Sequence, residues 1–415
     1  MLGKHVQGQL CRGFESPPLR HFNEAGMSRD RIERRNFLKS ALLGGTAVLV
    51  SGRASWAAVK VVVNDRRVIS QNPGRYHGWP TLSARVSGQL LLVCSGGREG
   101  HVCPFGRVEL MRSDDSGSSW SFPRVVMDGG IDDRDAGVLE TSSGAMLITT
   151  FTSNAYEPMF EKAEANPGSW DAKRLERWQA AHYRLSRPAR KASLGVWMIR
   201  STNGGITWSG RYRTILNSPH GPIELSDGRL LYPGKELWRK KGAPRVGFAQ
   251  SVNDGEAWEY LTDLPVREGD NKSDYHELNA IECASGRIVV QIRNHNKKNS
   301  GETLQSHSSD GGKTWSTPRS IGVWGLPSHL IRLGDGRLLM TYGHRRKPLG
   351  NQARVSNDEG KTWSEAMVIS GDGHSGDLGY PTTVEFADGS LLSVWYERLA
   401  SSPNAVLRQA DWEIK

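Results

Sequence analysis

The chain has 415 residues, of which 37% are hydrophobic and 24% are charged, and its formal net charge at pH 7 is +10. This length and apolar content suffice for a large core and exclude an intrinsically disordered chain, and no apolar run is long enough for a membrane-spanning helix. Half of the net charge lies in residues 1–58, which hold nine Lys and Arg against four Asp and Glu. The remaining charge is therefore too small to indicate nucleic-acid binding.

Residues 1–58 have the parts of an export signal. The basic run that contains Arg34 and Arg35 is followed by a weakly apolar stretch, residues 41–50, and by small residues that end at Ala58. This order of features is typical of a cleaved signal. A basic amphipathic helix is the alternative, but the Gly44-Gly45 pair fits a helix poorly.

The arginine pair followed by Phe-Leu-Lys resembles the twin-arginine signal, which exports folded proteins. We therefore expect cleavage near Ala57 or Ala58, with the twin-arginine machinery as a partner and a periplasmic or secreted location in a bacterium. Residues 59–415 are then expected to form the folded domain.

A turn pattern, Ser-x-Asp/Asn-x-Gly-x-x-Trp, occurs five times in this domain. Its copies begin at Ser113, Ser201, Ser251, Ser308 and Ser356. We expect the Asp or Asn side chain to accept hydrogen bonds from backbone amides two residues on, the Gly to supply a positive φ, and the Trp to pack beneath the loop. These residues are interpreted as structural.

A second repeat predicts six hairpins. In each, a turn ending in glycine precedes an apolar strand, and the glycines are Gly88, Gly144, Gly228, Gly286, Gly336 and Gly389. A glycine turn between two apolar runs is a hairpin signal. The interval between the second and third of these glycines, Gly144 and Gly228, is longer than the others. Its extra residues, about Tyr156 to Ser193, include Trp178, Ala181 and Leu185 at helical spacing.

Six repeated sheets predict an all-β, six-bladed β-propeller with a short helical insertion in the second blade, because radial closure protects the edges of repeated sheets. A strand near residues 59–63 and a strand at residues 405–414 remain to complete the last blade. Cys94, Cys103 and Cys283 form no zinc-binding pattern. A Cys94–Cys103 disulfide and free buried thiols are both compatible with the sequence.

The hairpin register predicts which side chains meet at the propeller axis. The residue nine positions before each turn glycine begins an inner strand, and the residue seven positions after it lies at the same end of the neighbouring strand. The residues selected in this way or adjacent to such positions are Trp79, Arg134, Asp135, Lys235, Glu236, His276, Glu277, Arg293, Arg345, Arg346, Tyr380 and Glu397. Lys235, Glu236 and Glu397 are equally compatible with a solvated rim. Together the arginines and carboxylates predict a site for an anionic ligand.

The Trp turns resemble Asp-box repeats, and with six hairpins residues 70–400 resemble the sialidase superfamily of six-bladed propellers. The resemblance implies a retaining glycosidase in which Tyr380 is the nucleophile and Glu277 receives its proton. It also implies an arginine cluster that holds the substrate carboxylate, for which Arg293 and Arg345, or Arg346 in its place, match the pattern. A structural Glu277–Arg293 ion pair beside a core tyrosine is the alternative.

Two departures from the family pattern concern the first blade. Gly78 stands where the family has an arginine, and Arg134 of the second blade is the candidate to replace it. The loop that normally brings an aspartate acid contains Arg98, Glu99 and His101 instead. We predict Asp135 as the acid/base, with His101 and Glu99 as rivals, and we predict that Arg98, His101 and His276 contact substrate.

These observations predict an exo-acting glycoside hydrolase that releases a terminal acidic sugar, sialic acid or a similar one, from a glycan or oligosaccharide. The alternatives are a non-catalytic carbohydrate-binding propeller, because the first-blade arginine is absent, and a glycosidase or lyase of other sugar specificity on the same scaffold. We expect no cofactor, no metal, no nucleic-acid partner and no integral membrane span.

Overall fold

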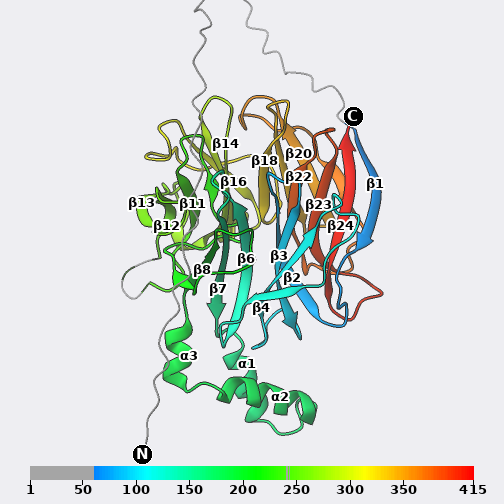
Figure 1. Ribbon diagram of the computed structural model, residues 1–415. Helices are drawn as coiled ribbons and strands as arrows, with labels where there is room; N and C mark the ends of the chain where they lie inside the picture. The colour runs from blue at the N-terminus through cyan, green and yellow to red at the C-terminus, as the bar shows by residue number, and fades with distance from the viewer. Residues whose placement is uncertain (1–59, 240–241, 243) are drawn as a thin grey trace, which may run out of the picture. The chain divides into compact units, whose positions relative to one another are not determined.

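The computed structural model describes residues 60–239, 242 and 244–415. The predicted signal segment, with its arginine pair and its cleavage site, lies outside the described residues. The described chain forms six four-stranded antiparallel sheets arranged as the blades of a propeller (Figure 1). The six-bladed all-β fold predicted from the hairpin spacing is confirmed.

Each of the first five blades uses four strands in chain order, with the first strand nearest the axis. The first blade consists of β2 (Tyr76–Ala84), β3 (Leu90–Arg98), β4 (Arg107–Ser113) and β5 (Arg124–Met127), and the second of β6 (Asp132–Glu140), β7 (Met146–Ser153), β8 (Val196–Ser201) and β9 (Tyr212–Arg213). The third blade consists of β10 (Ile223–Glu224), β11 (Leu230–Lys235), β12 (Val246–Ser251) and β13 (Glu259–Asp263), and the fourth of β14 (Tyr275–Glu282), β15 (Ile288–Asn294), β16 (Thr303–Ser308) and β17 (Arg319–Ser320). The fifth blade consists of β18 (Ser328–Arg332), β19 (Leu338–His344), β20 (Gly350–Ser356) and β21 (Met367–Ser370).

The sixth blade joins the two ends of the domain. Its strands are β22 (Leu378–Glu385), β23 (Leu391–Arg398), β24 (Ala405–Ile414) and, as the outermost strand, β1 (Val61–Val68). β1 pairs with β24 over its whole length, from Val61 opposite Ile414 to Val68 opposite Arg408. The two leftover strands therefore close the ring, as expected from the sequence.

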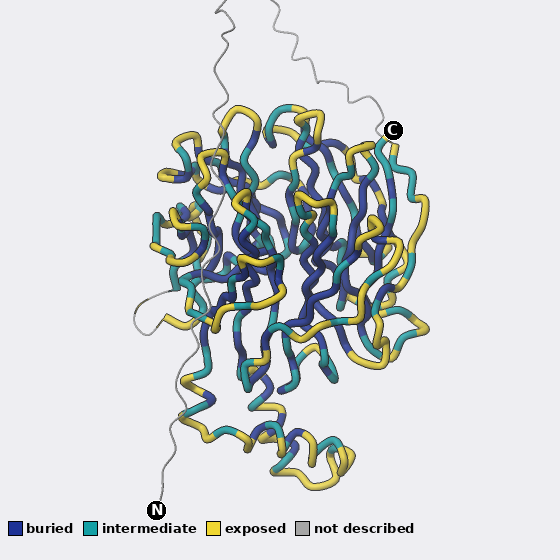
Figure 2. The backbone as a smooth tube through the Cα atoms, viewed as in Figure 1, coloured by how far each residue is buried: buried dark blue, intermediate teal, exposed yellow. Residues whose placement is uncertain are grey.

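The core lies between the blades. Six clusters of buried apolar side chains in the described chain each combine residues of two neighbouring blades. The second strand of each blade is correspondingly buried along nearly its whole length, and buried residues fill the interior of the propeller in Figure 2. Burial of this apolar surface is the main force that holds adjacent blades together.

The insertion between β7 and β8 forms three helices, α1 (Glu157–Glu164), α2 (Ala172–Tyr183) and α3 (Arg187–Ser193). They extend from the lower end of the propeller in Figure 1. Trp178 of α2 is fully buried in a small cluster with Cys103, Tyr156 and Phe160. The insertion is thereby packed against the loop that follows β3.

The five Trp turns connect the third and fourth strands of the first five blades. In the first, the Gly117 amide donates to Ser113 Oγ at 2.8 Å, and Asp115 Oδ1 accepts from the Ser119 amide at 2.9 Å. The aspartate thus accepts from an amide four residues on, and the expected two-residue spacing is wrong because the amide two residues on, that of Gly117, donates to the serine hydroxyl instead. The same bonds recur in the other four turns.

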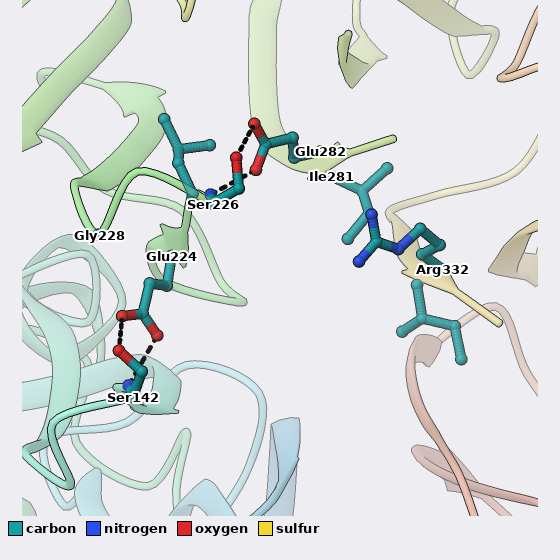
Figure 3. A pocket seen from close by; sticks show the side chains of 9 residues that line it. Ser142, Glu224, Ser226, Gly228, Ile281, Glu282 and Arg332 are labelled. Atoms are coloured by element: carbon teal, nitrogen blue, oxygen red, sulfur yellow. Dashed lines mark hydrogen bonds between the residues drawn. The ribbon is translucent and has the colours of Figure 1, made fainter. Parts of the chain in front are cut away.

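The hairpin turns lie at the same end of the propeller as the Trp turns. There, glutamates of one blade bind the turn of the preceding blade, as Glu224 does with the amide and hydroxyl of Ser142, at 2.8 and 2.5 Å, and Glu282 with those of Ser226, at 2.6 and 3.0 Å (Figure 3). These residues line a surface cavity at this end of the propeller. Arg332, which occupies the equivalent position in the fifth blade, is exposed and lines the same cavity. At this end of the ring, hydrogen bonds therefore link neighbouring blades.

Cys94, Cys103 and Cys283 are buried and free. The possible Cys94–Cys103 disulfide is not formed. None of the described helices is long and apolar enough to cross a membrane.

Candidate active site

Four inner strands carry the same bulge at the end opposite the hairpin turns. Trp79, Asp135, Glu277 and Tyr380 have φ values of 54°, 46°, 45° and 54°. Each lies where the register of the first two strands of its blade shifts by one residue. A left-handed backbone costs a residue with a side chain roughly 1–2 kcal/mol, so four repeated outliers indicate a constraint on where these side chains point.

These four residues are the ones that the hairpin register selected nine positions before the turn glycines. At the same positions of the third and fifth blades, nine residues before Gly228 and Gly336, stand Pro219 and Pro327, which cannot adopt a positive φ. The bulges therefore place only four of the six blades' side chains at the axis, from the first, second, fourth and sixth blades.

Tyr380 and Glu277 are in direct contact at the axis. The Tyr380 hydroxyl donates to Glu277 Oε1 at 2.5 Å, and Arg293 Nη1 binds Glu277 Oε2 at 2.5 Å and the Tyr380 oxygen at 3.3 Å. Burial, together with the negative charges of Glu277 and Asp135, raises the pKa of Tyr380 well above its usual value. The tyrosine is therefore protonated and needs a base before it can act as a nucleophile.

Glu277 has the charge state that such a base requires. Burial alone would raise the pKa of its carboxyl, but the positive charge of Arg293 and the hydrogen bonds from Tyr380 and Arg293 outweigh burial and lower it. The carboxylate is thus ionised while it accepts the tyrosine proton in a hydrogen bond.

Asp135 is a second carboxyl beside this pair. Its residue is only 7% exposed, and burial together with the charge of Glu277 raises its pKa to about 7 against the opposing effect of Arg134 and Arg293. Arg134 lies over the ring of Trp79, 4.4 Å from its centroid, and has a 3.5 Å contact with Asp132. Asp135 can therefore carry a proton near neutral pH.

A cavity of about 370 Å³ opens onto these side chains. Its walls comprise Trp79, His101, Arg134, Asp135, Phe151, Ser153, Ala155, Glu277, Arg293, Arg345, Tyr380 and Tyr396. The structure thus brings together seven of the nine predicted site residues. The volume is in the range of small-ligand sites.

Arg345 is the arginine of the cavity with the most unused bonding capacity. Its Nε donates to the Leu378 carbonyl at 3.0 Å, and its two terminal nitrogens have no hydrogen-bond partner among the described residues. Its neighbour Arg346, the other candidate, stacks on Trp324 at 4.8 Å and does not line the cavity.

Arg98 and His276 are not brought into the cavity. Arg98 is fully buried beneath it and paired with Asp132. His276 contacts Lys235 Nζ at 3.2 Å and stacks near His295, and burial and the charge of Lys235 lower its pKa to about 4. Both residues support the walls of the site from outside.

Glu99, one of the rivals for the acid, is held by the helical insertion. Arg177 Nε donates to its carboxylate at 2.8 Å, and Trp178 Nε1 does so at 3.0 Å. Although burial opposes the shift, these hydrogen bonds lower the pKa of Glu99. Among the rim residues, Glu397 is fully buried against Arg408, and Glu236 is paired with Arg245.

Gly78, which stands at the position of the missing arginine, lies close to the ring of Tyr76. A Cβ atom at Gly78 would lie 3.0 Å from the ring of Tyr76. Tyr76 is buried, and its hydroxyl contacts His101 and Asp377. At this position the first blade therefore has no arginine, and its inner strand contributes Trp79 to the cavity.

Asp377 and Tyr396 are residues of this region that the sequence analysis missed. Tyr396 was within reach, since it lies seven positions after Gly389, where the register rule selects a residue. Asp377 lies in the segment before β22, where no periodic pattern points to it. No group of three or more side chains able to hold a metal ion occurs in the described part of the chain.

Asp133, next to Arg134, allows a test of the buried charges around the site. It is fully buried, one of its carboxyl oxygens has no hydrogen-bond partner, and burial raises its pKa to about 8. A raised folded-state pKa stabilises the protein below the unfolded value of about 4, and this stabilisation is lost as the pH rises through 8. Wild type therefore loses stability between pH 4 and pH 8 that Asp133→Asn retains, so the free energy of unfolding of the variant relative to wild type is expected to rise by about 5 kcal/mol from pH 4 to pH 9.

Denaturant unfolding at the two pH values measures this gain. Asp114→Asn, at an exposed aspartate in the turn after β4, is the control and should change little at either pH. A constant difference between Asp133→Asn and wild type across the range would show that Asp133 is ionised throughout.

Comparison with known proteins agrees with the fold. Residues 159–392, more than half of the chain, match the BNR repeat-like domain family. The chain is 24% identical over 295 residues to a sialidase of Micromonospora viridifaciens, an alignment that covers 70% of this chain and 36% of that protein. It therefore spans about a third of the length of that relative.

Two solved structures are similar to the propeller. A protein of unknown function from Dyadobacter fermentans has a TM-score of 0.70 at 22% identity, with 86% of this chain and 99% of that chain covered. The NanB sialidase of Streptococcus pneumoniae has a TM-score of 0.59 at 16% identity, with 84% and 71% covered. The chain belongs to the BNR repeat-like domain family, and its six-bladed fold is similar to that of the sialidase propeller.

Proposed function

We propose that this protein is an exo-acting glycoside hydrolase that releases a terminal acidic sugar, sialic acid or a similar one, through a tyrosine nucleophile. The observation that carries the proposal is the contact of Tyr380 with Glu277, held by Arg293 in the axial cavity. A protonated tyrosine bound to an ionised carboxylate is the arrangement that a tyrosine nucleophile needs.

In this proposal Tyr380 attacks the anomeric carbon while its proton passes to Glu277. Arg134, Arg293 and Arg345 line the same cavity and hold the acidic group of the sugar, because guanidinium groups bind carboxylates in a planar, two-pronged geometry. Two cavity residues, Asp135 and His101, are candidates to protonate the leaving oxygen. Asp135, the choice from sequence, has the raised pKa that an acid at neutral pH requires.

The named activity of the Micromonospora relative supports the reaction class. Because the first blade has Gly78 in place of an arginine, the acidic group of the sugar is held by arginines of the other blades. Substrates therefore include sialic acids and other acidic sugars with a carboxylate at the anomeric end or elsewhere on the ring.

A panel of chromogenic glycosides tests the proposal. We expect hydrolysis of a carboxylated sugar, with its terminal residue released, and at least about a 100-fold lower kcat/KM for its neutral amide. Binding of the acidic sugars without turnover would instead identify a carbohydrate-binding propeller. Formation of an unsaturated product that absorbs in the ultraviolet would identify a lyase.

A further inference from the structure

His101 and Asp377 form a hydrogen-bonded pair at the edge of the axial cavity. Asp377 Oδ1 lies 2.9 Å from His101 Nδ1, 3.0 Å from the Tyr76 hydroxyl and 3.2 Å from the Tyr396 hydroxyl. The pair joins the loop after β3 to the segment before β22, 276 residues away. Three polar neighbours on one oxygen fix the position of this carboxylate.

The hydrogen bonds also determine which nitrogen of His101 carries the proton. An ionised carboxylate only accepts, so Nδ1 donates to Asp377. Burial alone would raise the pKa of Asp377, but the hydrogen bond and the charge of His101 outweigh it and lower the pKa. His101 Nε2 has no hydrogen-bond partner among the described residues and is the nitrogen left to exchange a proton with a ligand.

The imidazole ring of His101 is also held in place by an aromatic contact. Trp79 lies against it edge to face, with ring centroids 5.1 Å apart. The His101 side chain is 49% exposed, whereas Asp135 is almost fully buried among Glu277, Arg134 and Arg293. In an exo-acting enzyme the leaving group exits towards solvent, which places it on the His101 side of the cavity.

We propose that His101, oriented by Asp377, is the general acid and base of this site; the assignment rests on the proposed hydrolysis. In the first step the Tyr380 oxygen bonds to the anomeric carbon, the bond to the leaving oxygen breaks, the tyrosine proton moves to Glu277, and Nε2–H protonates the leaving oxygen. In the second step the oxygen of water bonds to the anomeric carbon while the bond from that carbon to the Tyr380 oxygen breaks. One proton of the water goes to Nε2, and Glu277 returns its proton to the Tyr380 oxygen.

Asp377 acts as a positioning residue in this scheme. It holds the Nδ1–H tautomer and stabilises the imidazolium, as a buried carboxylate does for a catalytic histidine. Asp135 then serves as a protonated carboxyl that donates a hydrogen bond to a substrate oxygen. The other titratable and charged groups near His101 are Tyr76, whose hydroxyl lies 3.0 Å from Nδ1, and Arg98, which donates to the His101 carbonyl at 2.9 Å. Tyr396 contacts Asp377, and Arg134 lies over the ring of Trp79.

The test compares leaving groups. On the methyl glycoside of an acidic sugar that the wild type hydrolyses, His101→Ala is expected to lower kcat/KM about 100-fold or more, because a poor leaving group needs its proton. On the 2,4-dinitrophenyl glycoside, whose leaving group needs no proton, the loss in the glycosylation step should stay below about tenfold. Azide should speed turnover of the variant and form the glycosyl azide, since azide needs no base.

Two further variants separate this role from a structural one. Asp377→Asn should keep activity on the dinitrophenyl glycoside but lower kcat, with KM little changed, on the methyl glycoside, because His101 loses the carboxylate that orients its ring. His374→Ala, an exposed histidine in the same segment, should match wild type throughout. Thermal unfolding of each variant checks the fold.

The proposal is overturned if Asp135→Asn shows the leaving-group dependence and azide rescue while His101→Ala loses both substrates equally or neither. That result would leave the hydrolase proposal intact with Asp135 as the acid. Retained hydrolysis of both glycosides by a Tyr380→Phe variant would instead reject the tyrosine mechanism itself, whatever His101 does.

Discussion

Tyr380→Phe is expected to lower kcat/KM for an acidic glycoside by about 10³-fold or more, because the variant has no oxygen to form the covalent bond to the sugar. The ring that packs at the axis and the Glu277–Arg293 ion pair are both retained. The dissociation constant for the released sugar should therefore change less than about tenfold. Steady-state kinetics and titration calorimetry with the product measure the two effects.

Tyr342→Phe is the matched control for this variant. Tyr342 is also a buried tyrosine whose hydroxyl binds neighbouring side chains, Gln352 and Arg354, but it does not line the axial cavity. Its removal should affect stability and leave kcat/KM near the wild-type value. If Tyr380→Phe retained the turnover of this control, Tyr380 would not be the nucleophile.

The fold was predictable because the sequence motifs that specify it repeat along the chain. Six glycine turns and five Trp turns repeat along the chain, and each repeat encodes one sheet that needs its neighbours to bury its faces. The same periodicity placed Trp79, Asp135, Glu277 and Tyr380 at the axis, since a strand register can be counted from the turn glycine. The bulges themselves were not predicted. Because of the bulge in β14, His276 and not Glu277 is the residue directly opposite Arg293 in the strand register.

The contacts made by residues outside the repeats were harder to predict from the sequence. Arg98 is buried because it meets Asp132 of the next blade, and Glu99 is turned away by Arg177 and Trp178 of the insertion. Asp377 reaches His101 through two loops. Such contacts depend on the paths of loops and on side chains distant in sequence, for which a single chain contains no repeated signal.

The arginines allow the sharpest test of the kind of substrate. Arg345→Lys is expected to reduce kcat/KM for an acidic glycoside about 30- to 300-fold, because a lysine cannot form the paired hydrogen bonds that the unused terminal nitrogens of Arg345 offer a carboxylate. Arg134→Lys should behave similarly but less strongly, since Arg134 is already in contact with Trp79 and Asp132. Both variants should lose much less on the neutral amide of the same sugar.

This selectivity, measured as the ratio of kcat/KM for the acid to kcat/KM for the amide, separates recognition of charge from support of the fold. Arg332→Lys is the control, because Arg332 lies at the opposite end of the propeller, in the cavity of Figure 3, and its ratio should equal that of wild type. Equal losses on acid and amide in Arg134→Lys would assign Arg134 to the wall of the cavity. The carboxylate would then be held by Arg293 and Arg345 alone, which is one arginine fewer than the cluster that the family resemblance implies.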